Sequence, residues 1–420
     1  GTKKYPTGTI ETILDKYGGN IDAFTSYDYT GYRITILKEH YNIALDILKE
    51  MLTSPTLDAK ELTKEMEVIK REMRLNKDDP GRRISRLAFS SAYTRHPYRL
   101  PIIGYEENFK RLDRTALLAF FKEQYTPEKI VLAVVGDIDS EALQEEIKDL
   151  FGKIPRGENM SQVLPIEPIQ IAEKQMEETQ DIEGAYLNIA FHSTGLLDHD
   201  LYALDLLAFI LGQSEGSILN KELRLKKELV LSISSYNYTP KHPGLFIISS
   251  ALKEENVQNA IDEVMKQLDL LKHQNVSEED LIRAKNNFLA DFIYQKETIS
   301  SQANDLAIGE LLTGNPNFFE VYIANINSVT IANIQRVANK YLIRDNMTVT
   351  VLSASGNSLK LAPESVRTKT NRQIEKFTLP NNLTVLLSQN KSLPIISISL
   401  LLKGGVRAET EGTNGISRLT

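Results

Sequence analysis

DRTALLAFFKEQYTPEKIVLAVV, residues 113–135, is followed 216 positions later by a stretch of the same design, VTIANIQRVANKYLIRDNMTVTVL, residues 329–352. Each stretch begins with a helical pattern, continues through a tyrosine (Tyr125 or Tyr341) and ends in an apolar run typical of a buried strand. The shared offset indicates a duplicated α+β domain. Helix-then-strand pairs also recur by chance in chains that mix the two elements, so unrelated blocks remain the alternative.

Further helix and strand patterns surround both stretches, and they divide the chain into two blocks that each combine helices with strands. The first block, residues 1–165, has a β-type stretch followed mainly by helical patterns with ordinary start and stop signals. Its expected elements are a strand region Ile21–Leu37, helices His40–Thr53, Asp58–Asn76, Gly81–Tyr93, Asp113–Gln124 and Ser140–Phe151, and strand Ile130–Val135.

The second block, residues 166–360, alternates strands and helices more evenly. Its expected elements are strands Ala185–His192, Leu229–Tyr236, Gly244–Leu252 and Met347–Leu352, and helices Leu201–Leu211, Glu255–His273, Ser277–Glu297 and Thr330–Tyr341. We therefore predict an α+β fold with two duplicated domains, each a mostly antiparallel sheet covered by helices.

The last part, residues 361–420, begins with a polar linker and then has a new strand pattern. Phe377–Leu387 contains Asn381 and Asn382, a hairpin-turn dipeptide, and Pro394–Lys403 is a second strand-like run. Because an isolated hairpin is marginally stable in water, we expect these to be the opening strands of a further unit, completed by other chain or by another molecule.

Composition narrows the functional classes. The chain has 420 residues, 41% hydrophobic and 25% charged, which is ordinary for a globular protein. It contains no cysteine, which excludes disulfides, cysteine zinc ligands and cysteine nucleophiles. A formal net charge of −7 argues against nucleic acid and anionic lipid as partners. No apolar run approaches the roughly 20 residues of a membrane helix.

The common catalytic motifs are absent from the sequence. The six histidines form neither H-x-x-E-H nor H-E-x-x-H, and there is no G-x-S-x-G elbow or P-loop. We expect each histidine to be a surface or packed side chain.

The helix predicted over Asp58–Asn76 carries the most informative pair of acidic residues. Glu65 and Glu72 are two turns apart and therefore share one face, at the shoulder of an apolar stripe. Two carboxylates at the edge of a core are costly unless a metal or a basic side chain compensates them. Lys64, Lys70 and Arg71 are close in sequence, so ordinary surface ion pairing is the alternative.

Several motifs together resemble the pitrilysin/insulinase family of metallopeptidases, in the bacterial branch related to the mitochondrial processing peptidases. The motifs, spread over nearly the whole chain, are Gly1-Thr2-Lys3, Gly18-Gly19-Asn20, the run from Asp22 to Thr30, the run from Glu65 to Glu72, His96-Pro97-Tyr98, Ile103-Gly104, Val135-Gly136-Asp137, and Leu223-Arg224 with Ser232-Ile233-Ser234. The resemblance implies one half of a clamshell protease.

The resemblance also implies a zinc site. Family members bind zinc through an inverted H-x-x-E-H motif, whose glutamate activates water, and through a distant glutamate. That glutamate follows the second histidine by roughly 76 positions, and the histidine is expected about five positions before Gly1. The third ligand would then be Glu72, with Glu65 as an acid that orients the site. The motif itself is not in this sequence, so we expect these 420 residues to bind catalytic zinc poorly and to cleave nothing.

The C-terminal part resembles the start of a second, degenerate unit of the same family. Gly404-Gly405-Val406-Arg407 and Asn414-Gly415-Ile416-Ser417 lead to Arg418, where the first zinc histidine would stand. Arginine stays protonated and does not ligate zinc. In the family the non-metal unit supplies an Arg and a Tyr seven residues apart. Here Arg224 is present but Leu231 occupies the tyrosine position, which fits a metal-side unit.

The resemblance further assigns a substrate-binding strand to Asp22, Ala23, Phe24 and Thr25, which would grip a peptide backbone by β-augmentation. Asp22 stands where the family usually has Asn, and it lacks the amide donor.

We therefore expect part of a bacterial zinc metalloendopeptidase, periplasmic or cytoplasmic with the periplasm favoured, that degrades or processes peptides and short unfolded polypeptides. Its partners would be the peptide substrate and an inactive family unit, in the same chain or as a heterodimer, with no nucleic acid and no membrane. The alternative is a non-catalytic structural or peptide-binding subunit of the same family.

Overall fold

The computed structural model describes residues 1–157, 164–273, 276–356 and 359, and in the C-terminal part residues 374–378, 380 and 384–388. Two compact units divide the chain, Gly1–Lys360 and Leu361–Thr420, and each is described by itself.

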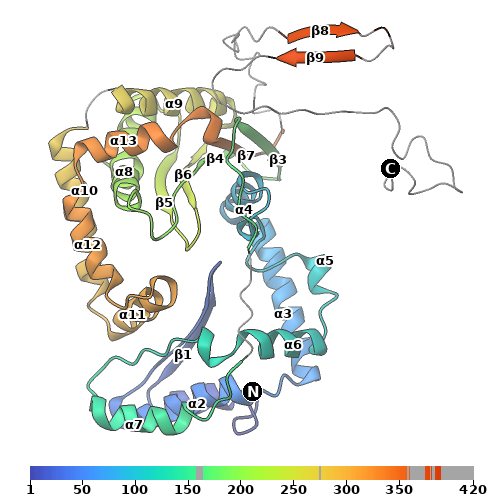
Figure 1. The fold of residues 1–420 in the computed structure, drawn as a ribbon, viewed down its shortest axis with the longest axis vertical. Coiled ribbons are helices and arrows are strands. Elements are labelled where there is room, and N and C mark those ends of the chain that lie inside the picture. Colours follow the sequence, from blue (N-terminus) through green and yellow to red (C-terminus); the bar gives the residue numbers. More distant parts are fainter. Residues whose placement is uncertain are drawn as a thin grey trace, which may run out of the picture. The chain divides into compact units, whose positions relative to one another are not determined.

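A β-hairpin and its flanking helices form the N-terminal part of the first unit (Figure 1). Strands β1 (Asn20–Thr25) and β2 (Thr30–Thr35) are antiparallel, with Asn20 opposite Thr35 and Thr25 opposite Thr30. The surrounding helices are α1 (Thr9–Lys16), α2 (Tyr41–Thr53), α3 (Ala59–Asp78), α5 (Glu106–Phe109), α6 (Arg114–Gln124) and α7 (Ser140–Phe151).

Helix α3 leads directly into α4 (Pro80–Ala92) through a single residue, Asp79. The extended backbone of Asp79 ends α3, and its carboxylate accepts a hydrogen bond from Arg82 N at 2.8 Å, which caps α4. Pro80 occupies the first helical position, where its missing N–H has no partner to lose. The two helices are therefore coupled at their junction.

A five-stranded sheet forms the core of the second block, in the order β3-β7-β4-β6-β5. The strands are β3 (Lys174–Thr179), β4 (Ala185–His192), β5 (Ser232–Tyr238), β6 (Leu245–Leu252) and β7 (Met347–Ser353). Only the pair β3–β7 is parallel, so the sheet is mostly antiparallel.

Both faces of this sheet are covered, as the central strand β4 shows. Its residues Leu187, Ile189 and Phe191 belong to the large core formed with α8, α9 and α13. Ala190, on the opposite face, packs in a second cluster with Phe89 of α4. Helix α4 comes from the first block, so a sequence boundary near residue 165 does not separate two independent packing layers.

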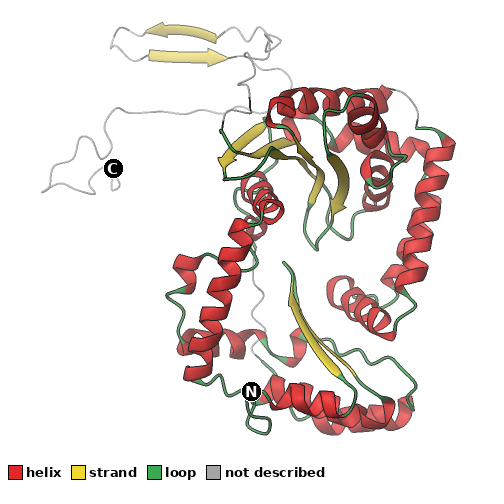
Figure 2. Cartoon of the chain, turned by 180° about the vertical axis from the view of Figure 1, so that it is seen from behind, coloured by secondary structure: helices red, strands yellow, loops and turns green. Residues whose placement is uncertain are grey.

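The helices of the second block cover the sheet and then extend away from it (Figures 1 and 2). They are α8 (Leu201–Gly212), α9 (Val257–His273), α10 (Glu278–Gln295), α11 (Ile299–Thr313), α12 (Phe318–Ser328) and α13 (Ile331–Tyr341). Helices α8, α9 and α13 lie on the sheet, whereas α10 leads out to α11 and α12 returns. None of the helices within the described ranges is long and apolar enough to cross a lipid bilayer.

In the second unit the structure describes one hairpin, β8 (Ile374–Thr378) paired antiparallel with β9 (Thr384–Ser388). This confirms the hairpin expected around Asn381 and Asn382. The turn itself, Pro394–Lys403, Gly404-Gly405 and Arg418 lie outside the described residues.

The α+β prediction is confirmed, and the expected helices are found with ends shifted by a few residues. The strand expected at Ile130–Val135 is wrong. Residues 131–135 form no strand, because a strand requires a neighbour for its N–H and C=O groups and no described segment supplies one. Strand β5 begins at Ser232 rather than Leu229. The sequence did not predict α1, α5, β3, α11 or α12. The boundaries at 165 and 360 stay predictions.

Candidate metal and substrate site

Glu65 and Glu72 lie on one side of α3, as their spacing predicted, and both side chains are exposed. Asp58 caps the helix by accepting hydrogen bonds from Lys60 N at 2.9 Å and Glu61 N at 3.1 Å. On the apolar stripe, Met73 is buried and its neighbours are half-buried, which fixes the rotation of the helix. The two carboxylates therefore lie at the edge of the packed side, exposed to solvent.

The nearby cations of α3 are bonded to other groups. Lys64 pairs with Glu61 at 2.8 Å, and Lys70 pairs with Glu67 at 2.7 Å. Arg71 donates from Nε to the Glu67 carbonyl. Within the described part of the chain, Glu65 and Glu72 have neither an ion pair nor a hydrogen bond. Among the described residues, the three cations near Glu65 and Glu72 in sequence therefore do not pair with either carboxylate.

Glu72 shares a cavity of about 1570 Å³ with the proposed substrate strand. Ala23, Phe24 and Thr25 of β1 line this cavity together with Glu72, although they lie about 50 positions away in sequence. The other walls are α3, α4 and the chain from Arg99 to Lys110, which includes α5. Asp22 and Glu65 do not line the cavity. The fold thus brings Glu72, but not Glu65, into the cavity that β1 lines.

Strand β1 has one edge available for a further strand. It pairs with β2 on one side, and the described chain places no strand on the other. Ala23 and Thr25 are exposed, whereas Phe24 is half-buried. Asp22 faces Arg33 across the hairpin and forms an ion pair with it at 2.7 Å. The Asp22 carboxylate is thus engaged within the hairpin.

The far end of the hairpin is fixed by a residue that the sequence did not single out for a role. Asp28, between β1 and β2, accepts hydrogen bonds from Tyr98 Oη at 2.6 Å and from Lys241 N at 2.9 Å. Tyr98 is 2% exposed and also accepts a hydrogen bond from His242 N at 3.2 Å. The hairpin β1–β2 is therefore tied to the β5–β6 loop of the second block. The motif His96-Pro97-Tyr98 was the available signal, but its partners are 70 and 144 positions away.

The described residues supply one candidate zinc ligand and no complete site. Among them, no group of three or more His, Asp or Glu side chains is arranged to hold a metal ion. The fit to zinc rests on a single observation, which is that the Glu72 carboxylate, at the wall of the cavity, has no partner among the residues that the structure describes. A carboxylate oxygen is a normal zinc ligand, so the donor type is suitable.

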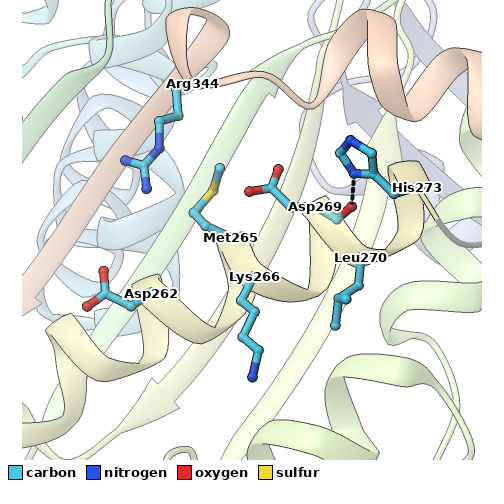
Figure 3. A pocket seen from close by; sticks show the side chains of 7 residues that line it. All are labelled: Asp262, Met265, Lys266, Asp269, Leu270, His273 and Arg344. Atoms are coloured by element: carbon cyan, nitrogen blue, oxygen red, sulfur yellow. Dashed lines mark hydrogen bonds between the residues drawn. The ribbon is translucent and has the colours of Figure 1, made fainter. Parts of the chain in front are cut away.

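A second hollow, of about 490 Å³, lies on α9 (Figure 3). Met265, Asp269 and His273 face Arg344 across it, and His273 Nδ1 is bonded to the Asp269 carbonyl at 2.8 Å. Its lining mixes two acidic and two basic side chains, which gives no obvious preference for a ligand.

Four other residues from the sequence motifs or among the histidines lie outside the cavity that β1 lines: Arg224, Leu231, His96 and His192. Arg224 is bonded to Asn220 Oδ1 at 3.0 Å and paired with Glu215, and Leu231 is 69% exposed. His96 and His192 are packed near the α4 end, and His192 Nε2 lies 3.1 Å from the Ala92 carbonyl.

The family models and relatives that match this chain are described as peptidases. One family model, described as insulinase (peptidase family M16), matches residues 1–106, and another, the peptidase M16 inactive domain, matches residues 111–288. The chain is 26% identical over 357 residues to a zinc protease of Bacillus subtilis, covering 85% of this chain and 86% of that protein. It is 25% identical to a probable mitochondrial-processing peptidase β subunit of Arabidopsis thaliana, covering 84% and 68%.

Solved structures show the same fold. A protease from Helicobacter pylori superposes with a TM-score of 0.76 at 24% identity, covering 84% of this chain and 86% of that one. A peptidase M16 inactive domain from Pseudomonas fluorescens gives a TM-score of 0.74 at 18% identity, with 84% and 85% covered.

Proposed function

Because this chain belongs to the pitrilysin/insulinase (M16) family of zinc peptidases, we propose that it is part of a zinc-dependent metalloendopeptidase that cleaves peptides and short unfolded polypeptides. One observation carries the proposal: Glu72 has no protein partner among the described residues and lines the same cavity as Ala23–Thr25.

Each residue has a distinct part in this proposal. Glu72 would hold the zinc through its carboxylate, and the described residues group no further ligands with it. Glu65, two turns earlier on α3, orients the site without touching the metal. Zinc, when bound, polarises a scissile carbonyl and lowers the pKa of a bound water. Strand β1 binds the peptide backbone as an added strand, which fixes its direction and register.

Pairing of the peptide backbone with β1 would limit the substrates to chains that can adopt an extended conformation. An added strand must be extended along its length, so a folded protein offers it few suitable segments. Peptides and unfolded chains meet this requirement without an unfolding cost. Asp22 has its carboxylate bonded to Arg33, so backbone binding in this proposal rests on Ala23–Thr25.

A second, inactive family unit completes the protein in this proposal. The hairpin β8–β9 supports it, since two strands need further strands to form a stable sheet. The enzyme is bacterial, with the periplasm favoured over the cytoplasm on the resemblance.

The competing proposal is a non-catalytic, peptide-binding subunit of the same family. The description of the model matching residues 111–288 as an inactive domain favours it, as does the lack of a complete metal-ligand group among the described residues. The two proposals share the fold and differ only in whether zinc binds with Glu72.

Zinc content separates them. The test uses the protein with its own sequence upstream of Gly1, as wild type and as Glu72→Ala. We expect about one zinc per wild-type chain and loss of both zinc and peptide cleavage in Glu72→Ala. Glu67→Ala is the matched control, because Glu67 is also exposed on α3 but is paired with Lys70. Full zinc and activity in Glu72→Ala would refute the assignment, and a metal-free wild type would favour the non-catalytic subunit.

A further inference from the structure

We propose that the cavity lined by β1, α3 and α4 preferentially binds peptides with acidic side chains. In this proposal Arg82 and Arg86 of α4 bind the carboxylates of the peptide. The inference rests on the proposed peptide-binding role of the cavity but not on zinc or on hydrolysis.

The lining of the cavity has an excess of positive charge. It contains seven cationic residues, Arg74, Lys77, Arg82, Arg83, Arg86, Arg99 and Lys110, and four acidic residues, Glu72, Glu106, Glu107 and Glu178. Two of the acidic residues are neutralised within the wall, since Glu178 pairs with Arg83 and Glu106 with Lys110. Five cationic residues thus remain without an acidic partner among the described residues, against two acidic ones.

This sign is opposite to that of the whole protein. The chain has a formal net charge of −7, so a randomly placed hollow would tend to be acidic. Walls that concentrate one sign of charge focus the field and raise the local concentration of oppositely charged ligands. The cavity therefore favours anionic over cationic peptides.

Arg82 and Arg86 are held in place by neutral groups. Arg82 Nη1 donates a hydrogen bond to Asn76 Oδ1, and the Arg86 guanidinium lies 5.0 Å from the centre of the Tyr105 ring. Neither contact neutralises the charge. The Asp79 carboxylate is close, but it accepts the Arg82 backbone N–H as the helix cap. Both guanidinium groups are positioned in advance, which lowers the entropy lost when a carboxylate binds.

The spacing of the two arginines suggests which peptides to use. They are four residues apart on α4, which corresponds to roughly 6 Å along the helix axis. Alternate side chains of an extended peptide point to the same side and are about 7 Å apart. A Glu-x-Glu sequence therefore matches the pair, and arginine binds carboxylates through its planar fork.

Binding of three labelled peptides to the 420-residue chain tests the proposal. The peptides share one uncharged extended sequence and differ only in carrying Glu-x-Glu, Gln-x-Gln or Lys-x-Lys, and fluorescence anisotropy reports Kd at several salt concentrations. We expect the Glu peptide to bind at least about fivefold tighter than the Gln peptide at low salt, with the difference shrinking as screening increases. The Lys peptide should bind weakest.

Variants assign the effect to the two arginines. Arg82→Gln/Arg86→Gln should remove the preference for Glu over Gln, whereas Arg82→Lys/Arg86→Lys should retain part of it. Lys266→Gln, which removes an exposed charge on α9 outside the cavity, is the control and should keep the full preference. An unchanged thermal transition identifies variants that are folded.

The outcomes separate this inference from the proposed function. Equal binding of the Glu and Gln peptides, or a preference that survives Arg82→Gln/Arg86→Gln, would overturn the charge selection and leave the peptidase proposal standing. Failure of all three peptides to bind would overturn both the selection and the peptide-binding role beneath it. Loss of zinc or cleavage in the Glu72 test has no bearing on either result.

Discussion

At the scale of single residues, burial changes the pKa of the Asp205 carboxyl more than its hydrogen bonds do. Asp205 of α8 accepts hydrogen bonds from Asn237 Nδ2 at 2.8 Å and from Tyr322 Oη, and it has no cationic partner among the described residues. Removal of its carboxyl from water raises the pKa to about 7, although both hydrogen bonds act in the opposite direction. The carboxyl is therefore protonated in much of the folded population at neutral pH.

The raised pKa of Asp205 predicts a pH dependence of stability. The folded state holds this proton more tightly than the unfolded chain, whose aspartate titrates near 4. The free energy of unfolding should therefore fall as pH rises from about 4 to about 7, by roughly 1.4 kcal/mol for each unit of the pKa difference. Asp205→Asn should remove this part of the slope. Denaturant titrations at pH 5 and pH 8 measure it, and an unchanged slope in the variant would contradict the prediction.

Glu72 and Glu65 lie two turns apart on the same helix but differ in their position relative to the cavity. Both are exposed on α3 and both lack partners among the described residues, but only Glu72 lines the cavity. Their spacing predicted the shared face, whereas the cavity that Glu72 lines is completed by segments distant in sequence, including strand β1.

At the scale of elements, helix α4 determines how α3, which carries Glu65 and Glu72, is held in place. Its carbonyl end is bound by Lys174 Nζ, which donates to Ala92 O at 2.7 Å, and its start is shared with α3 at Asp79. Between the two, Ile84 is 3% exposed and packs with Leu87 and with Leu352 of β7. Displacement of α4 would therefore also move the end of α3 near Glu72.

Truncation of Ile84 tests this coupling. Ile84→Ala removes buried apolar volume and should lower the free energy of unfolding by about 2–4 kcal/mol. Ser90→Ala, at an exposed position of the same helix, should change it by less than about 0.5 kcal/mol. Chemical denaturation gives both values, and hydrogen exchange at residues 70–80 should rise in Ile84→Ala. Unchanged exchange there would show that α3 is held independently of α4.

At the scale of the whole first unit, Asp28 links the two blocks. Its two carboxylate oxygens accept hydrogen bonds from Tyr98 of the first block and from the Lys241 backbone of the second. Tyr93 Oη adds a further bond to the Pro243 carbonyl at 2.8 Å. The hairpin β1–β2 is therefore oriented by the second block, which positions the proposed substrate strand.

Removal of one hydroxyl group tests the link. Tyr98→Phe keeps the ring but leaves Asp28 Oδ1 and His242 N without this partner, so it should cost about 1–3 kcal/mol of stability. We expect faster hydrogen exchange in residues 20–35 and 238–243 together. Tyr5→Phe is a suitable control, because Tyr5 Oη is bonded to Asp46 away from the junction. Faster exchange in only one of the two segments would argue against a shared anchor.

A further prediction at this scale concerns metal binding. The 420 residues alone should bind zinc weakly, because no described group of three or more side chains is arranged as a ligand set. Metal analysis after dialysis should find well below one zinc per chain. Tight stoichiometric zinc would show that ligands other than those proposed are present within these residues.

The sequence by itself determined the local features of this protein. Periodicity and capping residues placed the helices, and the spacing of Glu65 and Glu72 placed both on one face, because these properties depend on residues a few positions apart. The repeated design identified Tyr125 and Tyr341 but not their partners, Tyr32 Oη at 2.7 Å and Asp200 Oδ2 at 2.8 Å. Only the tertiary structure brought Glu72 to β1, α4 onto the sheet of the second block and Asp28 to Tyr98. It also left residues 131–135 without a strand partner. These outcomes depend on contacts between segments that are distant in sequence. Hydrophobic patterns and turn residues predict the structure of each segment separately, but they do not specify which segments come into contact.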